Sequence, residues 1–331
     1  MPKQIKLVTG GGGFLGGAIV RRLISQGETV RSFSRRGYSE LEALGVEQVR
    51  GDLSDKDAVA SACKDVETVY HVAAKPGVWG SYDAYYRPNV VGTENIINGC
   101  LSGGVRRLIY TSSPSVVFDG TDMEGIDETA PYPPSFHAPY PQTKAIAEKK
   151  VVAAAKEGLA TVSLRPHLIW GPGDNHLVPR IIKRAHRLRK VGDGSNLVDT
   201  IYIDNAAWAH VLAEKRLRSN PELSGRIYFI SQDEPIPLWK MIDLILAAGG
   251  KPPVARSISP AAALFAGTLL EGIYKILNLK SEPLMTRFVA KELATSHWFN
   301  IQAAKKDLGY RPIVSTEEGL KRLAVWLKSH P

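Results

Sequence analysis

A glycine-rich turn directly after the first strand-like segment constrains the fold of this chain more than any other feature. The sequence runs IKLVTGGGGFLGG from Ile5, so that Gly10, Gly13 and Gly16 have the spacing T-G-x-x-G-x-x-G. Between a strand and a helix, the first glycine permits the tight turn, the second lets the backbone approach a pyrophosphate, and the third allows close helix–strand packing. The helix N-terminus then offers free N–H groups to the phosphates. The turn therefore predicts a dinucleotide-binding α/β domain.

Strand-like and helix-like segments alternate through the first half of the chain. We expect strands at residues 5–9, 29–33, 68–72, 107–112 and 161–165, and helices at 15–26, 55–63, 83–101 and 140–157. This alternation predicts a Rossmann-type, doubly wound parallel sheet over residues 1–171. Beyond it the pattern is mostly helical, with one more strand at 226–231. We therefore predict a smaller, mostly helical substrate lobe over 172–331, with some strands returning to the main sheet.

Composition and charge exclude several classes of protein. The two cysteines, Cys63 and Cys100, fit neither a metal site nor a disulfide framework, so we expect no metal site. No targeting signature and no apolar run of about 18 residues is present, and we expect a cytoplasmic protein. The net charge of +9 could attract nucleic acid, an anionic membrane or an anionic ligand. Without a nucleic-acid module, an anionic cofactor and substrate remain the expected partners.

Two segments of the second half have more than one interpretation. The basic run over residues 180–190 is expected to form the solvated face of a helix. The apolar segment 260–279, PAAALFAGTLLEGIYKILNL, is interpreted first as a buried helix pair that lines a pocket. The alternative is a surface that meets a lipid-like substrate, a partner protein or a membrane interface.

The end of the second strand favours NADP(H) over NAD(H). Residues 32–36 read SFSRR and contain no carboxylate that could bond the ribose 2′-hydroxyl of NAD. Arg35 or Arg36 could instead pair bidentately with a 2′-phosphate. After the third strand, Asp52 and Leu53 are expected to face the adenine, the alternative being a solvated loop aspartate.

Tyr140 and Lys144 are the candidate catalytic pair. They stand four residues apart at the start of a predicted helix and so share one helical face. A phenol with a pKa of about 10 is a poor acid–base near neutrality, but a nearby ammonium and an oxidised nicotinamide lower that pKa. A hydroxyl in the TSSPS segment could polarise the substrate carbonyl; Ser113 is the first choice and Ser115 the second.

These motifs make the chain similar to the extended short-chain dehydrogenases/reductases, in the 3β-hydroxysteroid dehydrogenase branch. TGGGGFLG matches the cofactor turn and YPQTK the Tyr-x-x-x-Lys motif, while HVAA from His71, NVVGT from Asn89 and RPHLIWGPG from Arg165 match segments around the active site. The resemblance covers essentially the whole chain. The cofactor-binding residues expected from the motifs and the resemblance together are Thr9, Gly10, Gly13, Phe14, Leu15, Gly16, Ser34, Arg35, Arg36, Asp52, Leu53, Ala73, Ala74, Lys75, Tyr140, Lys144 and Pro166.

Two groups within that branch share longer stretches with this chain. RPH, VGDGSNLVD and DEPIPLW resemble the decarboxylating sterol-4α-carboxylate 3-dehydrogenases. AAKPGVWGSYDAYY, LIWGPGDNHLVPR and MTRFVAKELATSHWFN resemble the 2-alkyl-3-oxoalkanoate reductases of bacterial olefin biosynthesis. The second resemblance implies NADPH-dependent reduction of a long-chain 2-alkyl-3-oxoalkanoate to the 3-hydroxy acid. The alternatives are an NAD(P)-dependent 3β-hydroxysteroid or sterol-4α-carboxylate dehydrogenase and a non-catalytic dinucleotide-sensing protein.

Either carboxylate-bearing substrate would need an anion-binding group beside the site of hydride transfer. Lys75, His167, His176 and Arg180 are candidates for that task. The expected substrate-contacting residues are Trp79, Asn89, Ser115, His167 and His176. The resemblance also implies a β-lactone synthetase and a decarboxylase of the same pathway as partners. A homodimer through the helices bearing Asp83 and Tyr140, and a peripheral place at a membrane, are further expectations.

Overall fold

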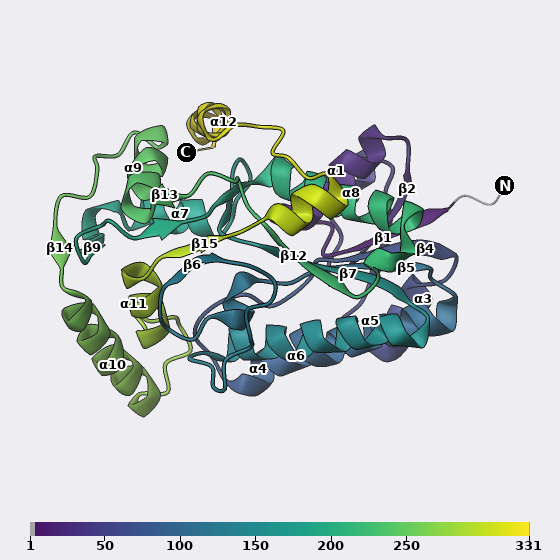
Figure 1. Ribbon diagram of the computed structural model, residues 1–331, viewed down its shortest axis with the longest axis horizontal. Helices are drawn as coiled ribbons and strands as arrows, with labels where there is room; N and C mark the ends of the chain where they lie inside the picture. Colours follow the sequence, from purple (N-terminus) through teal and green to yellow (C-terminus); the bar gives the residue numbers. More distant parts are fainter. Residues whose placement is uncertain (1–3, 331) are drawn as a thin grey trace.

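The computed structural model describes residues 4–330, and its centre is a seven-stranded parallel sheet (Figure 1). The strand order is β12-β7-β5-β4-β1-β2-β3, and every pairing is parallel. The strands are β1 (Ile5–Thr9), β2 (Thr29–Ser34), β3 (Glu47–Arg50), β4 (Val66–His71), β5 (Arg107–Thr111), β7 (Ala160–Pro166) and β12 (Arg226–Ile230). The order reverses beside β1, which is where such sheets bind ligands. The predicted fold class is confirmed.

Helices cover both faces of this sheet because its strands are apolar on both sides. Leu7 and Val8 are neighbours on β1, yet each joins a different hydrophobic cluster, since successive strand residues point to opposite faces. One face carries α1 (Phe14–Ser25) and α8 (Ile203–Ser219), and the other carries α3 (Lys56–Ala62), α5 (Gly92–Gly103) and α6 (Pro139–Ala154). The short α2 (Ser39–Ala43) leads into β3.

The second lobe lies beside the carboxyl ends of the main strands, at the left of Figure 1. Its helices are α7 (Leu177–Lys183), α9 (Leu238–Ala248), α10 (Pro260–Ile276), α11 (Arg287–Ala294) and α12 (Thr316–Ser329). Its strands are β6 (Met123–Ile126), β15 (His297–Phe299), β10 (Leu197–Val198) and β13 (Ile236–Pro237) in one small sheet, with the pairs β8 (Ile169–Trp170)–β11 (Ile201–Tyr202) and β9 (Lys190–Val191)–β14 (Ser257–Ile258). The chain crosses back to the main sheet to add α8 and β12.

The long helix expected over residues 83–101 is present and contains one irregular turn. A helix α4 (Tyr82–Tyr86) runs into a π turn over Arg87–Val91, and α5 follows. Pro88 has no N–H and cannot make the regular helical hydrogen bond, so the hydrogen-bond pattern shifts at this point. The chain is therefore helical from Tyr82 to Gly103, as expected, and the irregular turn within it contains Asn89.

The helix expected over the basic run 180–190 also ends early. α7 stops at Lys183, a single 3-10 turn follows, and Lys190 begins β9. The Lys190 N–H donates to the Arg256 carbonyl at 2.8 Å, so pairing with β14 replaces helical hydrogen bonds. Basic side chains of this run, with Lys251 and Arg256, line a surface groove of about 700 Å³.

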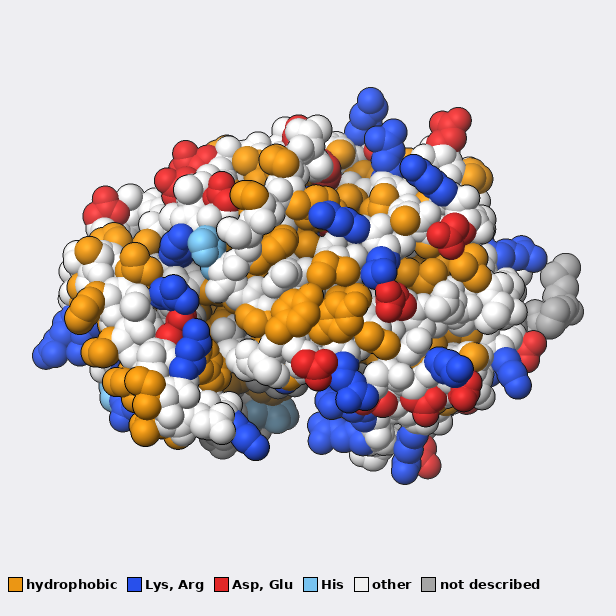
Figure 2. Space-filling view, turned by 90° about the horizontal axis from the view of Figure 1, so that it is seen from below, with side chains coloured by type: hydrophobic (Ala, Val, Ile, Leu, Met, Phe, Trp, Pro, Cys, Tyr) orange, Lys and Arg blue, Asp and Glu red, His pale blue; other side chains and the backbone are white. Residues whose placement is uncertain are grey.

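The apolar segment 260–279 forms one helix with an exposed apolar side, so its interpretation as a buried helix pair is wrong. Phe265 is 71% exposed and Ile276 is 84% exposed, whereas Gly267 on the opposite side faces α11. A Cβ atom at Gly267 would lie 2.7 Å from the Thr286 carbonyl carbon, so the two helices approach closely. Figure 2 shows this end of the molecule at the left, where hydrophobic side chains lie among lysines and arginines. Within residues 4–330, no helix is long and apolar enough to cross a bilayer.

Candidate active site

The glycine turn connects the carboxyl end of β1 to the N-terminus of α1. Gly10 has a φ of +69°, which favours glycine, and its N–H donates to the Phe33 carbonyl at 2.8 Å. A Cβ atom at Gly16 would lie only 2.1 Å from the Gly10 carbonyl oxygen, so helix and turn are in direct backbone contact. Gly13 is the N-cap of α1, and no described side chain caps that helix end. The backbone N–H groups there fit the phosphates of a dinucleotide.

A chain of hydrogen bonds fixes the loop that faces the glycine turn. The Thr9 hydroxyl accepts the Val72 and Ala73 N–H groups at 3.0 Å each and therefore donates to His71 Nδ1 at 2.9 Å. His71 Nε2 then donates to Thr93 at 3.0 Å. Burial, with a smaller contribution from the Lys144 charge, lowers the pKa of His71 to about 3, so the ring is neutral in this chain. The network joins the ends of β1 and β4 to α5.

Asn89 braces the same loop from the π turn. Its Oδ1 accepts the Lys75 N–H at 2.7 Å, and its Nδ2 donates to the Lys75 carbonyl at 3.2 Å and to Thr143 Oγ1 at 3.1 Å. Asn89 is buried, and protein groups occupy both ends of its amide. The Lys75 ammonium lies 5.0 Å from the centre of the Tyr85 ring.

Two exposed arginines stand at the carboxyl end of β2. Arg36 Nε donates to the Tyr38 hydroxyl at 3.2 Å, and its guanidinium lies 5.1 Å from the centre of that ring. The Tyr38 ring lies against the glycine turn, since a Cβ atom at Gly12 would be 2.2 Å from it. Sequence reasoning missed Tyr38, whose position depends on a distant hydrogen bond to Gln48.

Asp52 is held by Ser54, whose hydroxyl and N–H donate to the Asp52 carboxylate and lower the pKa of Asp52. The nearby Arg35 lowers this pKa further.

Tyr140 and Ser113 come together at the carboxyl edge of the sheet. Ser113 follows β5 and contacts Ser115 through their hydroxyls at 2.9 Å, while Tyr140 lies in the first turn of α6. Burial raises the pKa of Tyr140 to about 12, the nearby Ser113 hydroxyl lowers it, and the charge of Glu292 raises it further. Tyr140 is therefore a protonated phenol at neutral pH in the cofactor-free chain. The arrangement places two hydroxyl donors beside each other.

Lys144 lies one helical turn after Tyr140 and is buried. Its ammonium donates to the Thr111 carbonyl at 2.6 Å and lies 4.2 Å from the centre of the Tyr110 ring. Burial lowers the pKa of Lys144 to about 7, although the Glu148 carboxylate one turn further raises it. Glu148 is itself neutralised by Arg165, at 2.6 and 2.9 Å. The protein therefore offers little negative charge to stabilise the ammonium form of Lys144.

The predicted substrate residues are spread over a wider region. His167 is neutral, because burial lowers its pKa well below the usual value, and its Nε2 has no partner within residues 4–330. His176 precedes α7 and is held through its N–H by Asp174 at 2.7 Å. The indole N–H of Trp79 donates to the Leu279 carbonyl of the second lobe at 3.2 Å. Arg180 forms an ion pair with Glu282, so it is not a free cation.

Glu292 joins the site although sequence reasoning did not select it. It lies on α11, far from Tyr140 in the sequence, but its charge is close enough to raise the pKa of the Tyr140 phenol. Burial alone raises the pKa of Glu292 to about 8. Within MTRFVAKELATSHWFN nothing distinguishes this glutamate from a solvated helix residue, so only the folded chain could identify it.

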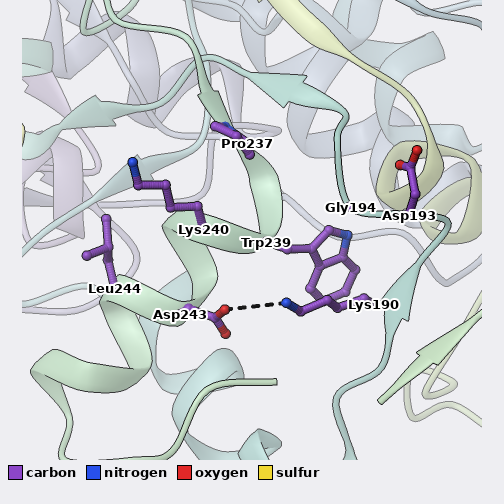
Figure 3. Close-up of a pocket in the computed structure, with 8 residues that line it drawn as sticks. All are labelled: Lys190, Asp193, Gly194, Pro237, Trp239, Lys240, Asp243 and Leu244. Atoms are coloured by element: carbon purple, nitrogen blue, oxygen red, sulfur yellow. Dashed lines mark ion pairs between the residues drawn. The ribbon is translucent and has the colours of Figure 1, made fainter. Parts of the chain in front are cut away.

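A separate pocket of about 350 Å³ lies in the second lobe between β9, β13 and α9 (Figure 3). An ion pair between Lys190 and Asp243, at 3.7 Å, crosses its wall, and the buried Trp239 ring forms part of its lining. No residue of the catalytic group lines this pocket. The Tyr140, Ser113 and Lys144 side chains therefore lie outside this pocket.

The parallel sheet, its glycine turn and the Tyr140–Lys144 pair point to one class of protein. That class is the dehydrogenases and reductases that bind a dinucleotide. The chain belongs to the 3-beta hydroxysteroid dehydrogenase/isomerase family, whose sequence profile matches residues 7–256. It is 51% identical over 321 residues to the 2-alkyl-3-oxoalkanoate reductase of Stenotrophomonas maltophilia (strain K279a), covering 96% of this chain and 97% of that protein.

A second relative and a solved structure extend the comparison. The decarboxylating sterol-4-alpha-carboxylate 3-dehydrogenase of Mus musculus is 34% identical over 323 residues, covering 95% of this chain and 88% of that protein. The crystal structure of gox2253 superposes with a TM-score of 0.80 at 26% identity, covering 99% of this chain and 98% of that one. The family resemblance drawn from the motifs is confirmed.

Proposed function

We propose that this chain reduces the 3-oxo group of a long-chain 2-alkyl-3-oxoalkanoate to the 3-hydroxy acid, using NADPH. One observation carries the proposal: Tyr140, Ser113 and Lys144 lie at the carboxyl edge of the sheet that also carries the glycine turn, in a chain 51% identical to a 2-alkyl-3-oxoalkanoate reductase. The presence of both Tyr140 and Lys144 also argues against a non-catalytic sensor. The steroid alternative has the weaker support of a relative at 34% identity.

The protein groups divide the work of carbonyl reduction. When bound, the reduced nicotinamide supplies a hydride to the carbonyl carbon. Tyr140 donates its proton to the carbonyl oxygen, and Ser113 donates a hydrogen bond to the same oxygen as negative charge develops there. Lys144 in its ammonium form stabilises the resulting Tyr140 phenolate. The raised pKa of Tyr140 keeps the phenol protonated until that transfer.

A direct assay tests this proposal. Purified protein is given long-chain 2-alkyl-3-oxo acids or 3-oxosteroids, each with NADPH or NADH, and cofactor oxidation is followed by absorbance. Analogous oxidation assays use 3β-hydroxysteroids with NADP⁺ or NAD⁺. We expect turnover of the acids with NADPH. Turnover of steroids alone would replace this function with the steroid alternative, and no turnover of either class would remove both.

The preference for NADPH is supported by charge at the end of β2. Arg35 and Arg36 are exposed, and that strand end has no carboxylate to bond a ribose 2′-hydroxyl. Arg36 lies over Tyr38, next to the glycine turn that would hold the phosphates. A guanidinium in this place suits a 2′-phosphate, which it can bond bidentately.

Arg35→Ala and Arg36→Ala should therefore weaken the binding of NADPH and not that of NADH. Loss of one charged hydrogen-bonding partner costs about 1.5–3 kcal/mol, so we expect KM for NADPH to rise by about 10- to 100-fold in at least one variant. KM for NADH should stay unchanged. Arg106→Ala, an exposed arginine before β5, is the matched control. Equal changes for both cofactors would contradict the cofactor assignment.

The outer surface of the second lobe supports contact with an anionic lipid surface. The second lobe exposes the apolar side of α10 and also carries a groove lined by basic side chains. Apolar side chains can insert at a bilayer interface, and basic side chains attract anionic lipids. We expect sedimentation with phosphatidylglycerol vesicles but not with phosphatidylcholine vesicles. Phe265→Asp should lower that binding by about 10-fold or more. Val325→Asp, at a similarly exposed apolar position on α12, should leave it unchanged, and equal loss in both variants would contradict this surface.

A further inference from the structure

Glu292 is an ionisable group of the active site for which the reduction above gives no role. It is half-buried on α11 and makes no hydrogen bond or ion pair within residues 4–330. A carboxyl group so placed must obtain its hydrogen-bond partner from solvent or from a ligand. Its position relative to the catalytic group decides which ligand it can meet.

The packing of α11 directs the Glu292 face of the helix toward the catalytic segments. Phe288 lies one turn earlier on the same face, and its ring packs edge-on against Phe118 at 5.9 Å. Phe118 directly follows the 3-10 turn that Ser113 caps. The contact therefore brings this face of α11 beside the end of β5.

A second contact ties α11 to the start of α6. The Lys291 ammonium lies 3.2 Å from His137 Nε2, and His137 precedes Tyr140 by three residues. Lys291 is thus engaged away from Glu292. Both contacts bring Glu292 close to Tyr140, where its charge acts on the phenol although the two groups share no hydrogen bond.

The chemistry of the substrate then determines which protonation state of Glu292 can lie next to the substrate. A 3-oxoalkanoate carries its carboxylate two bonds from the carbonyl carbon that is reduced, so the carboxylate must lie near Tyr140 and Ser113. An ionised glutamate there would repel it. An un-ionised carboxyl group would instead donate a strong O–H···O⁻ hydrogen bond. Burial favours the un-ionised form, since it raises the pKa of Glu292 to about 8.

We propose that Glu292 donates a hydrogen bond from its carboxyl group to the carboxylate of the bound substrate and thereby selects acids over neutral ketones. This inference rests on the proposed reduction of 3-oxoalkanoates. It makes Glu292 a specificity-determining residue that adds to substrate binding and leaves proton transfer to Tyr140.

The experiment compares a 2-alkyl-3-oxo acid with its methyl ester in wild type, Glu292→Ala and Glu292→Gln. For the acid, Glu292→Ala should raise KM by about 10-fold or more while kcat changes less, because a charged hydrogen bond to the bound substrate is lost. For the ester, both constants should change by less than about 2-fold. Glu292→Gln should restore most of the acid affinity, since the amide N–H can donate. Glu317→Ala, at an exposed glutamate on α12, is the control, and a thermal melt of each variant checks folding.

Three results would overturn the proposal. These are equal losses for acid and ester in Glu292→Ala, unchanged KM for the acid, or tighter binding of the acid in Glu292→Gln than in wild type. Should Glu292→Ala fail to fold, the acid-to-ester ratio of Glu292→Gln and Glu292→Leu decides the question. Failure of the underlying function is distinct, because wild type would then reduce neither acid nor ester.

Discussion

Tyr140→Phe is expected to lower kcat for carbonyl reduction by about 10³-fold, within the range that positioned general acids contribute. The substitution removes only the phenolic O–H, so the carbonyl oxygen loses its proton donor while Ser113 can still donate a hydrogen bond. The affinity for cofactor should change by less than about 3-fold, because the glycine turn and the β2 arginines are untouched. Stopped-flow reduction and fluorescence titration with NADPH measure the two quantities separately.

Tyr85→Phe is the control for this prediction. The Tyr85 ring also lies near Tyr140, but its hydroxyl is committed to the Trp79 carbonyl at 2.9 Å. Its loss should lower kcat by less than about 10-fold. If Tyr140→Phe kept most of its activity, or if both variants lost activity equally, Tyr140 would not be the proton donor.

Lys144→Met should inactivate the enzyme and stabilise the fold at low pH. The ammonium is buried, and burial lowers its pKa from the usual 10.5 to about 7. Below pH 7 the group is charged in both the folded and the unfolded chain, so the full cost of burying the charge is present. Between about pH 7 and 10.5 the unfolded chain binds more protons, so this cost falls as pH rises. Methionine carries no charge to bury.

We expect Lys144→Met to raise the free energy of unfolding by about 1–3 kcal/mol at pH 6, with the gain shrinking toward pH 10. The lost hydrogen bond to the Thr111 carbonyl offsets part of the gain. Urea denaturation of both proteins at pH 6 and pH 9 measures it. A variant less stable than wild type at pH 6 would show that Lys144 is a structural cation.

The same lysine predicts the pH dependence of the wild-type reaction. As pH rises through about 7, Lys144 loses its proton and the Tyr140 phenolate loses the charge that stabilises it. The rate of reduction should therefore fall with rising pH, whereas Lys144→Met should show a low and flat profile. A wild-type profile that stays flat from pH 6 to pH 9 would contradict this role.

Local patterns were sufficient for the parts of the site that lie within one segment. The glycine spacing determines a turn in which Gly10 takes positive φ and Gly16 touches the Gly10 backbone. The four-residue spacing of Tyr140 and Lys144 places both on one face of α6. Pro88 shows the limit of pattern reading: hydrophobic periodicity continues across it, but its missing N–H shifts the hydrogen bonds into a π turn.

The sequence by itself determined the class of sheet, the dinucleotide turn and the Tyr140–Lys144 pair, because each follows from spacings within one strand or helix. Only the tertiary structure decided that α10 exposes its apolar side, that Tyr38 lies against the glycine turn, and that Glu292 lies close to Tyr140. These depend on contacts between segments far apart in the chain, and on burial, which sets the pKa values of Tyr140, Lys144 and Glu292. Neither contact nor burial at long range is encoded in a local spacing.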